Sequence, residues 1–335
     1  MGKKLNYIAI IFLHALIITS CFGYRPEQVG IIHDNTFELR QEGCTGEILL
    51  SWGKDSVARV YISNQILSLL FNKNDYVIEL YDLTTLRKIK PLVKYGKVEG
   101  EMLMVDYSAG SGTVILYDFV KNIITSIDIN RAASQNDYKP VFRNQRVMTQ
   151  ERIPFEEGKL LCLNPYSYKD SEPRFIITDD NGDYIFKKHN YDSFNVVDGT
   201  LLYNKENETI AFLSLYSPYI EFSHLKSNEI ERLAIPRTEE INVKGIKNGK
   251  ITEYYFLNHV PLCFVGGDSN DDYIIGAYLD EDKNSYLVIT DWQGHQVKSF
   301  RIEGRVNSVS ITDSGEFAYC LSTIGEKTLL IKYEL

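Results

Sequence analysis

Apolar residues along this chain come in short runs of strand length, and helical periodicity is almost absent. Runs rich in Ile, Val, Leu, Tyr and Phe alternate with clusters of Asn, Asp, Gly and Ser, which favour turns. One unit repeats in register, because residues 177–185 (ITDDNGDYI) match residues 289–297 (ITDWQGHQV). In both, Asp ends an apolar strand and Gly follows a two-residue gap. The pattern predicts β-hairpins in which Gly supplies the positive φ of a tight turn.

Looser copies of this hairpin give a column of six marker residues along the chain. The markers are Asp82, Asp118, Asp179, Ser223, Asp291 and Glu334, separated by 36, 61, 44, 68 and 43 residues. Four-stranded propeller blades take ~40–50 residues each, and longer intervals leave room for loops. A pair of β-sandwiches is the competing fold, but it gives no reason for one register in six places. We therefore predict an all-β, six-bladed β-propeller.

The last unit predicts how the ring closes. Its strand ends at the C-terminus, so no outer strand can follow it. Propellers commonly solve this problem by letting an N-terminal strand complete the final blade, which leaves only short, protected edges. Asn35–Leu39 and Glu47–Trp52 are the two candidates for that strand.

The first 21 residues carry the pattern of an export signal. Lys3 and Lys4 precede a fourteen-residue apolar run, Leu5–Ile18, which is shorter than the ~20 residues of a transmembrane helix. The run ends in Ile18-Thr19-Ser20-Cys21, which resembles the lipobox of bacterial lipoproteins. That resemblance implies cleavage before Cys21 and a lipid on Cys21. An ordinary secretory signal with a chance cysteine is the alternative.

These features predict three parts of the chain and a location. We expect a signal peptide over residues 1–20, a tether over 21–34 and the propeller over 35–335. Without residues 1–20 the chain has 34 basic and 45 acidic residues, a formal net charge of −11. Such a chain offers no electrostatic footprint for nucleic acid, and an anionic lipid surface would repel it. We therefore expect a cell-envelope protein held by lipid on Cys21, with the membrane and its face left open.

Four cysteines remain beyond Cys21. They are Cys44, Cys162, Cys263 and Cys320, and the last three sit in apolar runs. The spacings are far wider than those of a zinc site. Three disulfide pairings are possible and the sequence does not choose among them, but burial in strands already explains the three apolar positions.

A short segment adds a resemblance to a known family. Residues 95–102 (YGKVEGEM), with the lipobox and the six units, resemble the TolB-like six-bladed propeller lipoproteins of Gram-negative bacteria. In that family the link into the second blade typically reads Gly-basic-Gly-Pro-Gly-Glu-aromatic. The chain keeps Gly96, Lys97, Gly100 and Glu101, and it differs at Val98, Glu99 and Met102. The resemblance implies an envelope location and a binding role, and it transfers no catalytic residue.

Sequence motifs for chemistry are lacking. The chain has no Gly-x-Ser-x-Gly elbow and no Gly-x-x-x-x-Gly-Lys phosphate loop. The histidines beyond the signal, at positions 33, 189, 224, 259 and 295, show no ligand spacing. Residues 268–272 (DSNDD) begin like a calcium loop, but Tyr273 and Leu279 stand where Gly and Glu are needed. We predict no catalytic residue, no metal and no cofactor.

Tyrosine is the best clue to a binding surface. Residues 164–168 (NPYSY) and 215–219 (LYSPY) are Pro-punctuated connections between the second and third strands of units three and four. In a propeller such connections emerge on the same face as the crossovers between blades. The predicted ligand-binding residues are Tyr166, Tyr168, Tyr216 and Tyr219, with Asp280 and Asp282 at the rim. Packing of the rings against blade edges is the alternative.

Two function classes remain from the sequence. The first is a non-catalytic module that binds a protein or a glycan, favoured because no constellation of residues requires chemistry. The second is an envelope enzyme that cleaves glycans at the central channel, since the fold hosts both classes. A His clustered with two acids on the channel-lining first strands would favour the enzyme.

Overall fold

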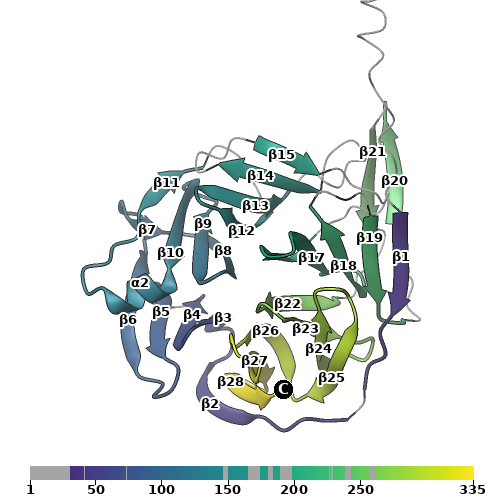
Figure 1. Ribbon diagram of the computed structural model, residues 1–335. Coiled ribbons are helices and arrows are strands. Elements are labelled where there is room, and N and C mark those ends of the chain that lie inside the picture. Colours follow the sequence, from purple (N-terminus) through teal and green to yellow (C-terminus); the bar gives the residue numbers. More distant parts are fainter. Residues whose placement is uncertain are drawn as a thin grey trace, which may run out of the picture.

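The computed structural model is a ring of six sheets, which follow one another around the ring in chain order (Figure 1). It describes residues 31–40, 42–72, 74–145, 150–164, 174–179, 184–188, 198–225, 227, 229–237, 243–249, 251–256 and 262–335. The predicted all-β, six-bladed propeller is confirmed. The predicted signal peptide, residues 1–20, and the lipidation site Cys21 lie outside the described residues.

The first three blades contain the following elements. Blade I has β3 (Val57–Ser63), β4 (Ile66–Phe71), β5 (Tyr76–Asp82) and β6 (Lys88–Tyr95), with the short β7 (Glu101–Met102) parallel to β6. Blade II has β8 (Val105–Gly110), β9 (Thr113–Asp118), β10 (Ile123–Asp128) and β11 (Phe142–Asn144), and helix α2 (Ile129–Ser134) follows β10. Blade III has β12 (Gln150–Glu156), β13 (Lys159–Leu163), β14 (Phe175–Asp179) and β15 (Tyr184–Lys188).

The last three blades include both N-terminal strands. Blade IV has β16 (Gly199–Asn204), β17 (Thr209–Ser214), β18 (Tyr219–His224) and β19 (Glu229–Ala234), with β1 (Ile31–Thr36) parallel to β19. Blade V has β22 (Phe264–Ser269), β23 (Tyr273–Leu279), β24 (Ser285–Asp291) and β25 (Gln296–Ile302). Blade VI has β26 (Arg305–Ile311), β27 (Phe317–Ile324), β28 (Lys327–Glu334) and β2 (Glu47–Gly53). A separate hairpin, β20 (Val243–Asn248) and β21 (Ile251–Phe256), is inserted between blades IV and V.

The antiparallel order of each blade gives the ring two distinct faces. The first strand of each blade is innermost, and successive strands reverse direction. The crossovers between blades and the connections between second and third strands therefore share one face, which we name the crossover face. The first-to-second and third-to-fourth connections share the opposite face, which we name the turn face.

The ring is closed by the second of the two predicted N-terminal strands, Glu47–Trp52. β2 pairs antiparallel with β28, from Glu47 opposite Lys332 to Gly53 opposite Lys327. The other candidate strand, Asn35–Leu39, lies in blade IV, where β1 pairs with β19 and Phe37 continues that ladder by donating to the Ala234 oxygen at 2.7 Å. Phe37 is fully buried between blades IV and V. Apolar burial therefore places this segment on blade IV.

One marker residue belongs to a different hairpin from the one predicted. Asp118 ends the second strand of blade II, whereas Asp82 and Asp291 end third strands. The equivalent of these two in blade II is Asp128, which changes the intervals on either side to 46 and 51 residues. The physical reason is that Asp accepts backbone N–H groups in either kind of turn: Asp118 accepts from Val120 (2.9 Å) and Asp82 from Thr85 (2.7 Å).

Buried side chains fill the gaps between neighbouring blades. Six hydrophobic clusters are found among the described residues, one at each interface between blades. Three of the four cysteines, Cys162, Cys263 and Cys320, are buried, Cys44 is partly exposed, and no disulfide joins any two of them. None of the helices in the described part of the chain has both the length and the apolar character to cross a membrane.

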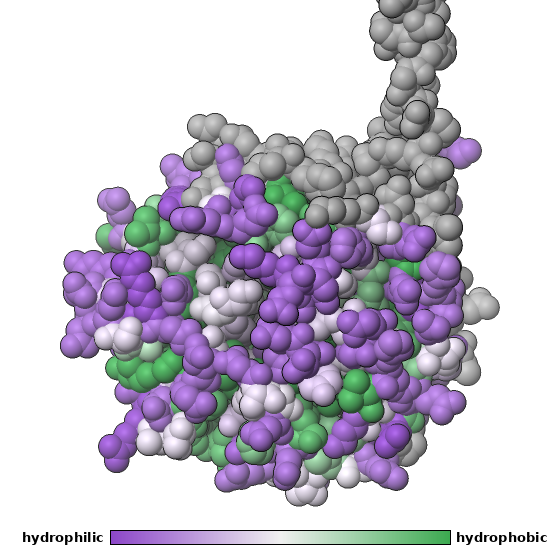
Figure 2. Space-filling model, viewed as in Figure 1, coloured by the Kyte–Doolittle hydropathy of each residue, from purple (hydrophilic) through white to green (hydrophobic). Residues whose placement is uncertain are grey.

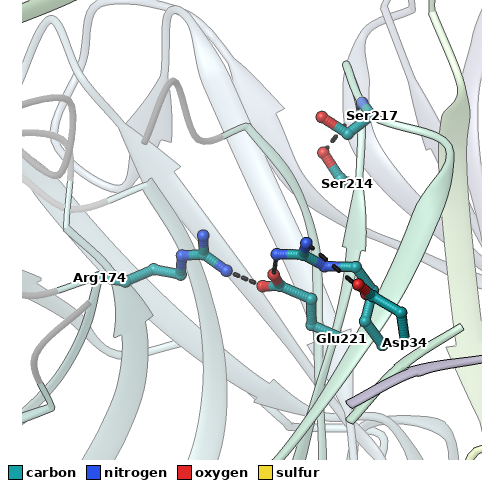
Figure 3. A network of polar contacts seen from close by, with 6 residues as sticks. Asp34, Arg174, Ser214, Ser217 and Glu221 are labelled. Atoms are coloured by element: carbon teal, nitrogen blue, oxygen red, sulfur yellow. Dashed lines mark hydrogen bonds and ion pairs between the residues drawn. The ribbon is translucent and has the colours of Figure 1, made fainter. Parts of the chain in front are cut away.

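An ionic network fastens β1 to blade IV and blade IV to blade III (Figure 3). Both carboxylate oxygens of Glu221 are used, one by Arg174 of blade III and the other by Arg232 of β19, the latter at 2.7 Å. The Arg174 and Glu221 side chains are each 3% exposed. Arg232 also lies 3.9 Å from Asp34 of β1. A buried carboxylate shared by two guanidinium groups holds three strands in one arrangement.

Candidate functional site

The first strands line the central channel, and their crossover-face ends bring charged residues together. We name this group the channel-mouth cluster: Arg59, Asp106, Tyr107, Glu151 and Asp198. Arg59 reaches across the ring, because its Nη1 donates to the backbone oxygens of Val265 (3.0 Å) and Asn307 (3.3 Å). Its Cζ lies 5.4 Å from the Tyr107 ring centroid, a cation–π distance. The cluster thus sets Arg59 among three carboxyl groups, and a second cation, Arg152, lies 3.4 Å from Asp106.

The pKa values of two channel-mouth carboxyl groups are raised above their ordinary values. Burial, reinforced by the charge of Asp106, raises the pKa of Glu151 to about 8. Burial also raises the pKa of Asp198, and Asp106 acts in the same direction. Glu151 has a positive φ of 27°, a conformation that costs a non-Gly residue roughly 1–3 kcal/mol. A glutamic acid that keeps its proton near neutral pH can donate a hydrogen bond at this position.

At its turn-face end the channel opens into a cavity of about 210 Å³, lined by residues that include Ser63, Gly110 and Asn204. Toward the mouth it narrows to a space of about 40 Å³, lined by residues that include Arg59, Tyr61, Glu151 and Asp268. That space holds about one or two water molecules and no larger ligand. A ligand would therefore meet the channel-mouth acids from the crossover face only.

The predicted tyrosines separate into two environments. Tyr166 and Tyr168 lie outside the described residues. Tyr216 is half-buried on the crossover face, and burial together with the charge of Asp198 raises the pKa of its hydroxyl. Tyr219 begins β18, and its ring lies 4.3 Å from the Arg232 guanidinium of the ionic network. Tyr216 therefore borders the channel mouth, whereas Tyr219 serves packing in blade IV.

The predicted rim aspartates also differ from each other. Asp280 accepts hydrogen bonds from Asn284, at 2.8 Å from the backbone N–H and 2.9 Å from the side-chain amide, so it closes its own turn. Asp282 is exposed in the same turn. Cys263 connects this turn to Tyr216, because its N–H donates to the Leu215 oxygen (2.7 Å) and its own oxygen accepts from Leu279 (2.9 Å). Tyr216 and Asp280 are thus adjacent on the crossover face.

A group of exposed apolar residues borders the channel mouth on the crossover face. We name it the crossover patch: Val98 (67% exposed), Met104 (53%), Phe119 (48%) and Val120 (55%). Its two loops are fastened together, since Lys121 Nζ donates to the Val98 oxygen (2.9 Å) and the Glu101 oxygen (2.7 Å). The buried Asp118 carboxylate accepts from the backbone N–H of Leu103 (2.6 Å). Sequence reasoning missed the patch, because its residues come from two loops.

The other exposed large apolar residues in the described part of the chain lie on separate elements: Ile48, Ile89, Val141, Ile246, Val297 and Ile324. On the face drawn in Figure 2, hydrophilic residues cover most of the described surface, and apolar residues form small separate groups. Single exposed apolar residues are normal, whereas several together often mark an interaction site. The crossover patch is such a group, and it continues into the channel mouth because Val105 and Asp106 directly follow Met104 in β8.

The pattern that would favour an enzyme is present only in part. Acids do gather on channel-lining strands, but His224 and His295 lie in turn-face hairpins and His33 lies in β1. His189 and His259 are outside the described residues. Within the described ranges, no group of three or more His, Cys, Asp or Glu residues is placed to hold a metal ion. The channel-mouth acids are therefore arranged around Arg59 rather than around a metal site.

The sequence matches no protein-family model and no curated protein. Solved structures share its fold. A candidate exported protein from Bacteroides fragilis has a TM-score of 0.56 and 12% identity, over 90% of this chain and 99% of that chain. A member of the DUF4221 family from Bacteroides vulgatus has a TM-score of 0.54 and 12% identity, over 88% and 99%. U3-55K has a TM-score of 0.50 and 10% identity, over 88% and 100%. At these identities the likeness is one of fold.

Proposed function

We propose that this protein is an exported propeller, anchored in the cell envelope by a lipid on Cys21, which binds a protein partner through its crossover face and catalyses no reaction. The crossover patch is the observation that carries the proposal. Four large side chains stand exposed on two loops that Lys121 and Asp118 hold in place. A preorganised apolar surface loses little conformational entropy on binding, which is what a stable protein contact needs.

The crossover patch and the charge of the whole chain indicate the kind of partner. Arg59 and Arg152, the latter 3.4 Å from Asp106, offset the channel-mouth carboxyl groups, whereas the chain without residues 1–20 has a formal net charge of −11. A basic protein surface with an apolar centre would complement both features. Charge of this kind mainly speeds association and excludes acidic partners, whereas the buried apolar centre supplies most of the affinity.

Export and anchoring rest on the N-terminal residues and on two resemblances. The signal pattern ends at Ser20-Cys21, and two Bacteroides propellers of nearly matching extent include one named as a candidate exported protein. The TolB-like segment supports the same location. Its residues have a structural role here: a Cβ on Gly96 would overlap the Glu101 carboxylate, which accepts the Val98 N–H at 3.0 Å.

Site-specific photo-crosslinking tests the binding face. A photoreactive phenylalanine analogue replaces Phe119 in the full chain in its native cells, and a matched variant carries it at Val297, which is 46% exposed in β25. We expect a discrete, protease-sensitive crosslinked species from position 119 and none from position 297. Val120→Ser in the same chain should weaken that crosslink. Equal crosslinking at both positions, or none at position 119, would contradict the proposal.

The enzymatic alternative has one observation in its favour. Glu151 keeps a proton to about pH 8 beside the Asp106 and Asp198 carboxyl groups, and glycoside cleavage uses a protonated acid opposite a carboxylate. Release of reducing ends from envelope glycans by the purified chain, abolished in Glu151→Gln, would establish that function. The binding proposal expects Glu151→Gln to leave the Phe119 crosslink in place.

A further inference from the structure

The hairpin of β20 and β21 is the only two-stranded sheet among the described elements. Its strands pair from Val243 opposite Phe256 to Asn248 opposite Ile251, and no ladder joins either strand to a blade in the described part of the chain. Figure 1 shows the hairpin at the periphery of the ring. An isolated two-stranded hairpin is marginally stable in water, so further strands would stabilise it.

The turn of the hairpin sets which backbone groups point outward. Asn248 pairs with Ile251 across a two-residue loop, and Gly249 has a positive φ of 66°, as the type I′ turn of such loops requires. The residues that flank a two-residue loop form a hydrogen-bonded pair, and such pairs alternate along the strands with pairs that are not hydrogen-bonded. The residues of β21 whose N–H and C=O groups point away from β20 are therefore Thr252, Tyr254 and Phe256.

The two free edges of the hairpin differ in chemistry. In β20, Lys244 and Lys247 are exposed, and lysine on an edge strand discourages pairing with another strand. β21 has no basic residue, and its sequence, Ile-Thr-Glu-Tyr-Tyr-Phe, is rich in residue types that favour strands. β21 is therefore the edge that can accept a further strand.

A second copy of β21 fits this edge in one register. Two copies of one strand can pair antiparallel about a two-fold axis, the symmetry of most homodimers, and outward-directed residues must then face each other. With Tyr254 at the axis, Thr252 pairs with Phe256 of the second copy, so every outward group of β21 is used. Glu253 then stands opposite Tyr255 of the second copy.

The neighbouring registers are less favourable. An axis at Glu253 would set the Glu253 carboxylates of the two copies opposite each other, and like charges directly opposite are destabilising. An axis at Tyr255 would leave Thr252 opposite no residue of β21. A partner for this edge must present an unpaired strand, and a second copy presents the same unpaired strand in the direction that fits.

We infer that two copies of this chain associate by antiparallel pairing of β21 with β21 of the second copy, centred on Tyr254. The two hairpins then form one four-stranded sheet, which is within the usual size of stable sheets. This contact goes beyond the protein-binding role proposed for the crossover face and does not depend on it. Loss of the Phe119 crosslink would leave the β21 contact untouched.

Disulfide trapping of the full chain in its native cells tests the contact. Tyr254→Cys sets two cysteines opposite each other at the Cα separation of about 5.5 Å of a hydrogen-bonded pair, which a disulfide can span. Lys247→Cys is the matched control, since Lys247 is exposed in β20, on the edge that the dimer does not use. Both variants also carry Cys44→Ala, which removes the partly exposed thiol. We expect a disulfide-linked dimer on a non-reducing gel from position 254 and none from position 247.

Proline substitution tests whether backbone pairing holds the two copies together. Thr252→Pro removes an outward N–H from β21, and Lys247→Pro removes one from β20 at the facing residue, so both disturb the hairpin alike. In the Tyr254→Cys chain, Thr252→Pro should lower the dimer fraction on the order of tenfold, and Lys247→Pro should leave it in place.

Three results would overturn the inference. The first is no disulfide-linked dimer from position 254, and the second is an equal amount from positions 254 and 247. The third is an equal loss of dimer with Thr252→Pro and with Lys247→Pro, because pairing through β21 requires the outward N–H of Thr252 and not that of Lys247.

Discussion

The Asp268 carboxyl group in β22 joins blades V and VI by hydrogen bonds, and it keeps its proton to a higher pH than an exposed aspartate does. Its Oδ2 accepts the Ile311 N–H at 3.1 Å and the Ser310 hydroxyl, both from blade VI, and its Oδ1 accepts from Ser269 at 2.9 Å. Burial raises its pKa to about 7, in spite of these hydrogen bonds. Together with Glu151, whose pKa is raised to about 8, it makes the folded chain bind protons that the unfolded chain releases.

These two residues predict that the protein loses stability as pH rises from about 4 to about 8. Both folded-state pKa values lie above the ordinary values of 3.8 and 4.5. Between those limits the folded state holds more protons than the unfolded state, so the free energy of unfolding falls by up to about 1.4 kcal/mol per pH unit for each group. We expect the Tm to be several degrees higher at pH 5 than at pH 8.

Thermal melts across this range, at constant ionic strength, check the prediction. The double variant Asp268→Asn, Glu151→Gln removes both titrating carboxyl groups, so its Tm should vary less with pH than that of the unaltered chain. An unchanged slope in the double variant would show that other groups control the pH dependence.

Single residues also explain which parts of the site the sequence could predict. Tyr216 and Asp280 could be placed on one face, because connections between second and third strands always emerge on the crossover side of a propeller. Glu151 and Asp198 could not, because each stands alone in the sequence and meets Arg59 only when the ring closes.

At the scale of elements, the sequence predicts where hairpins occur better than it predicts which two strands of a blade each hairpin joins. Asp118 and Asp128 both end apolar strands of blade II, and α2 lengthens the connection after Asp128. The wide interval between Ser223 and Asp291 has a simpler cause, the inserted hairpin of β20 and β21. Strand endings thus follow local turn chemistry, whereas the assignment of strands to blades depends on pairing between distant segments.

The two N-terminal strands predict a graded loss of stability on truncation. A chain that begins at residue 31 keeps both strands, one that begins at 47 loses β1 and Phe37, and one that begins at 54 also loses β2. Loss of the buried Phe37 should lower Tm on the order of 5–10 °C. Loss of β2 exposes the edge of β28, so the shortest chain should aggregate or unfold as a whole.

Thermal melts and size-exclusion chromatography of the three chains check this order. The chain that begins at residue 31 is the reference, since it removes only residues that precede β1. If the chain that begins at residue 54 melted and eluted like the reference, closure by β2 would be dispensable.

At the scale of the whole molecule, the direction of β1 sets how the ring is held. β1 is parallel to β19 and begins beside Glu229, directly after the β18–β19 turn. The chain therefore enters blade IV from the turn face. Nine residues lie between Cys21 and Ile31, and the ten residue-to-residue steps, even fully extended, reach no more than about 35 Å. On our proposal the lipid thus holds the turn face toward the bilayer and leaves the crossover patch directed away from it.

This arrangement depends on Cys21, and its replacement gives the last prediction. Because Cys21 is the one cysteine next to the expected cleavage point, Cys21→Ala should abolish incorporation of a radiolabelled fatty acid. It should also move the protein from the membrane fraction to the soluble fraction, or leave it with an uncleaved signal peptide. Cys44→Ala is the control, since Cys44 is the one cysteine of the described residues that is not buried, and it should keep both the label and the membrane association. A Cys21→Ala chain that still carried the fatty acid would mean that the protein is anchored elsewhere, and the assigned orientation of its two faces would fall with the anchor.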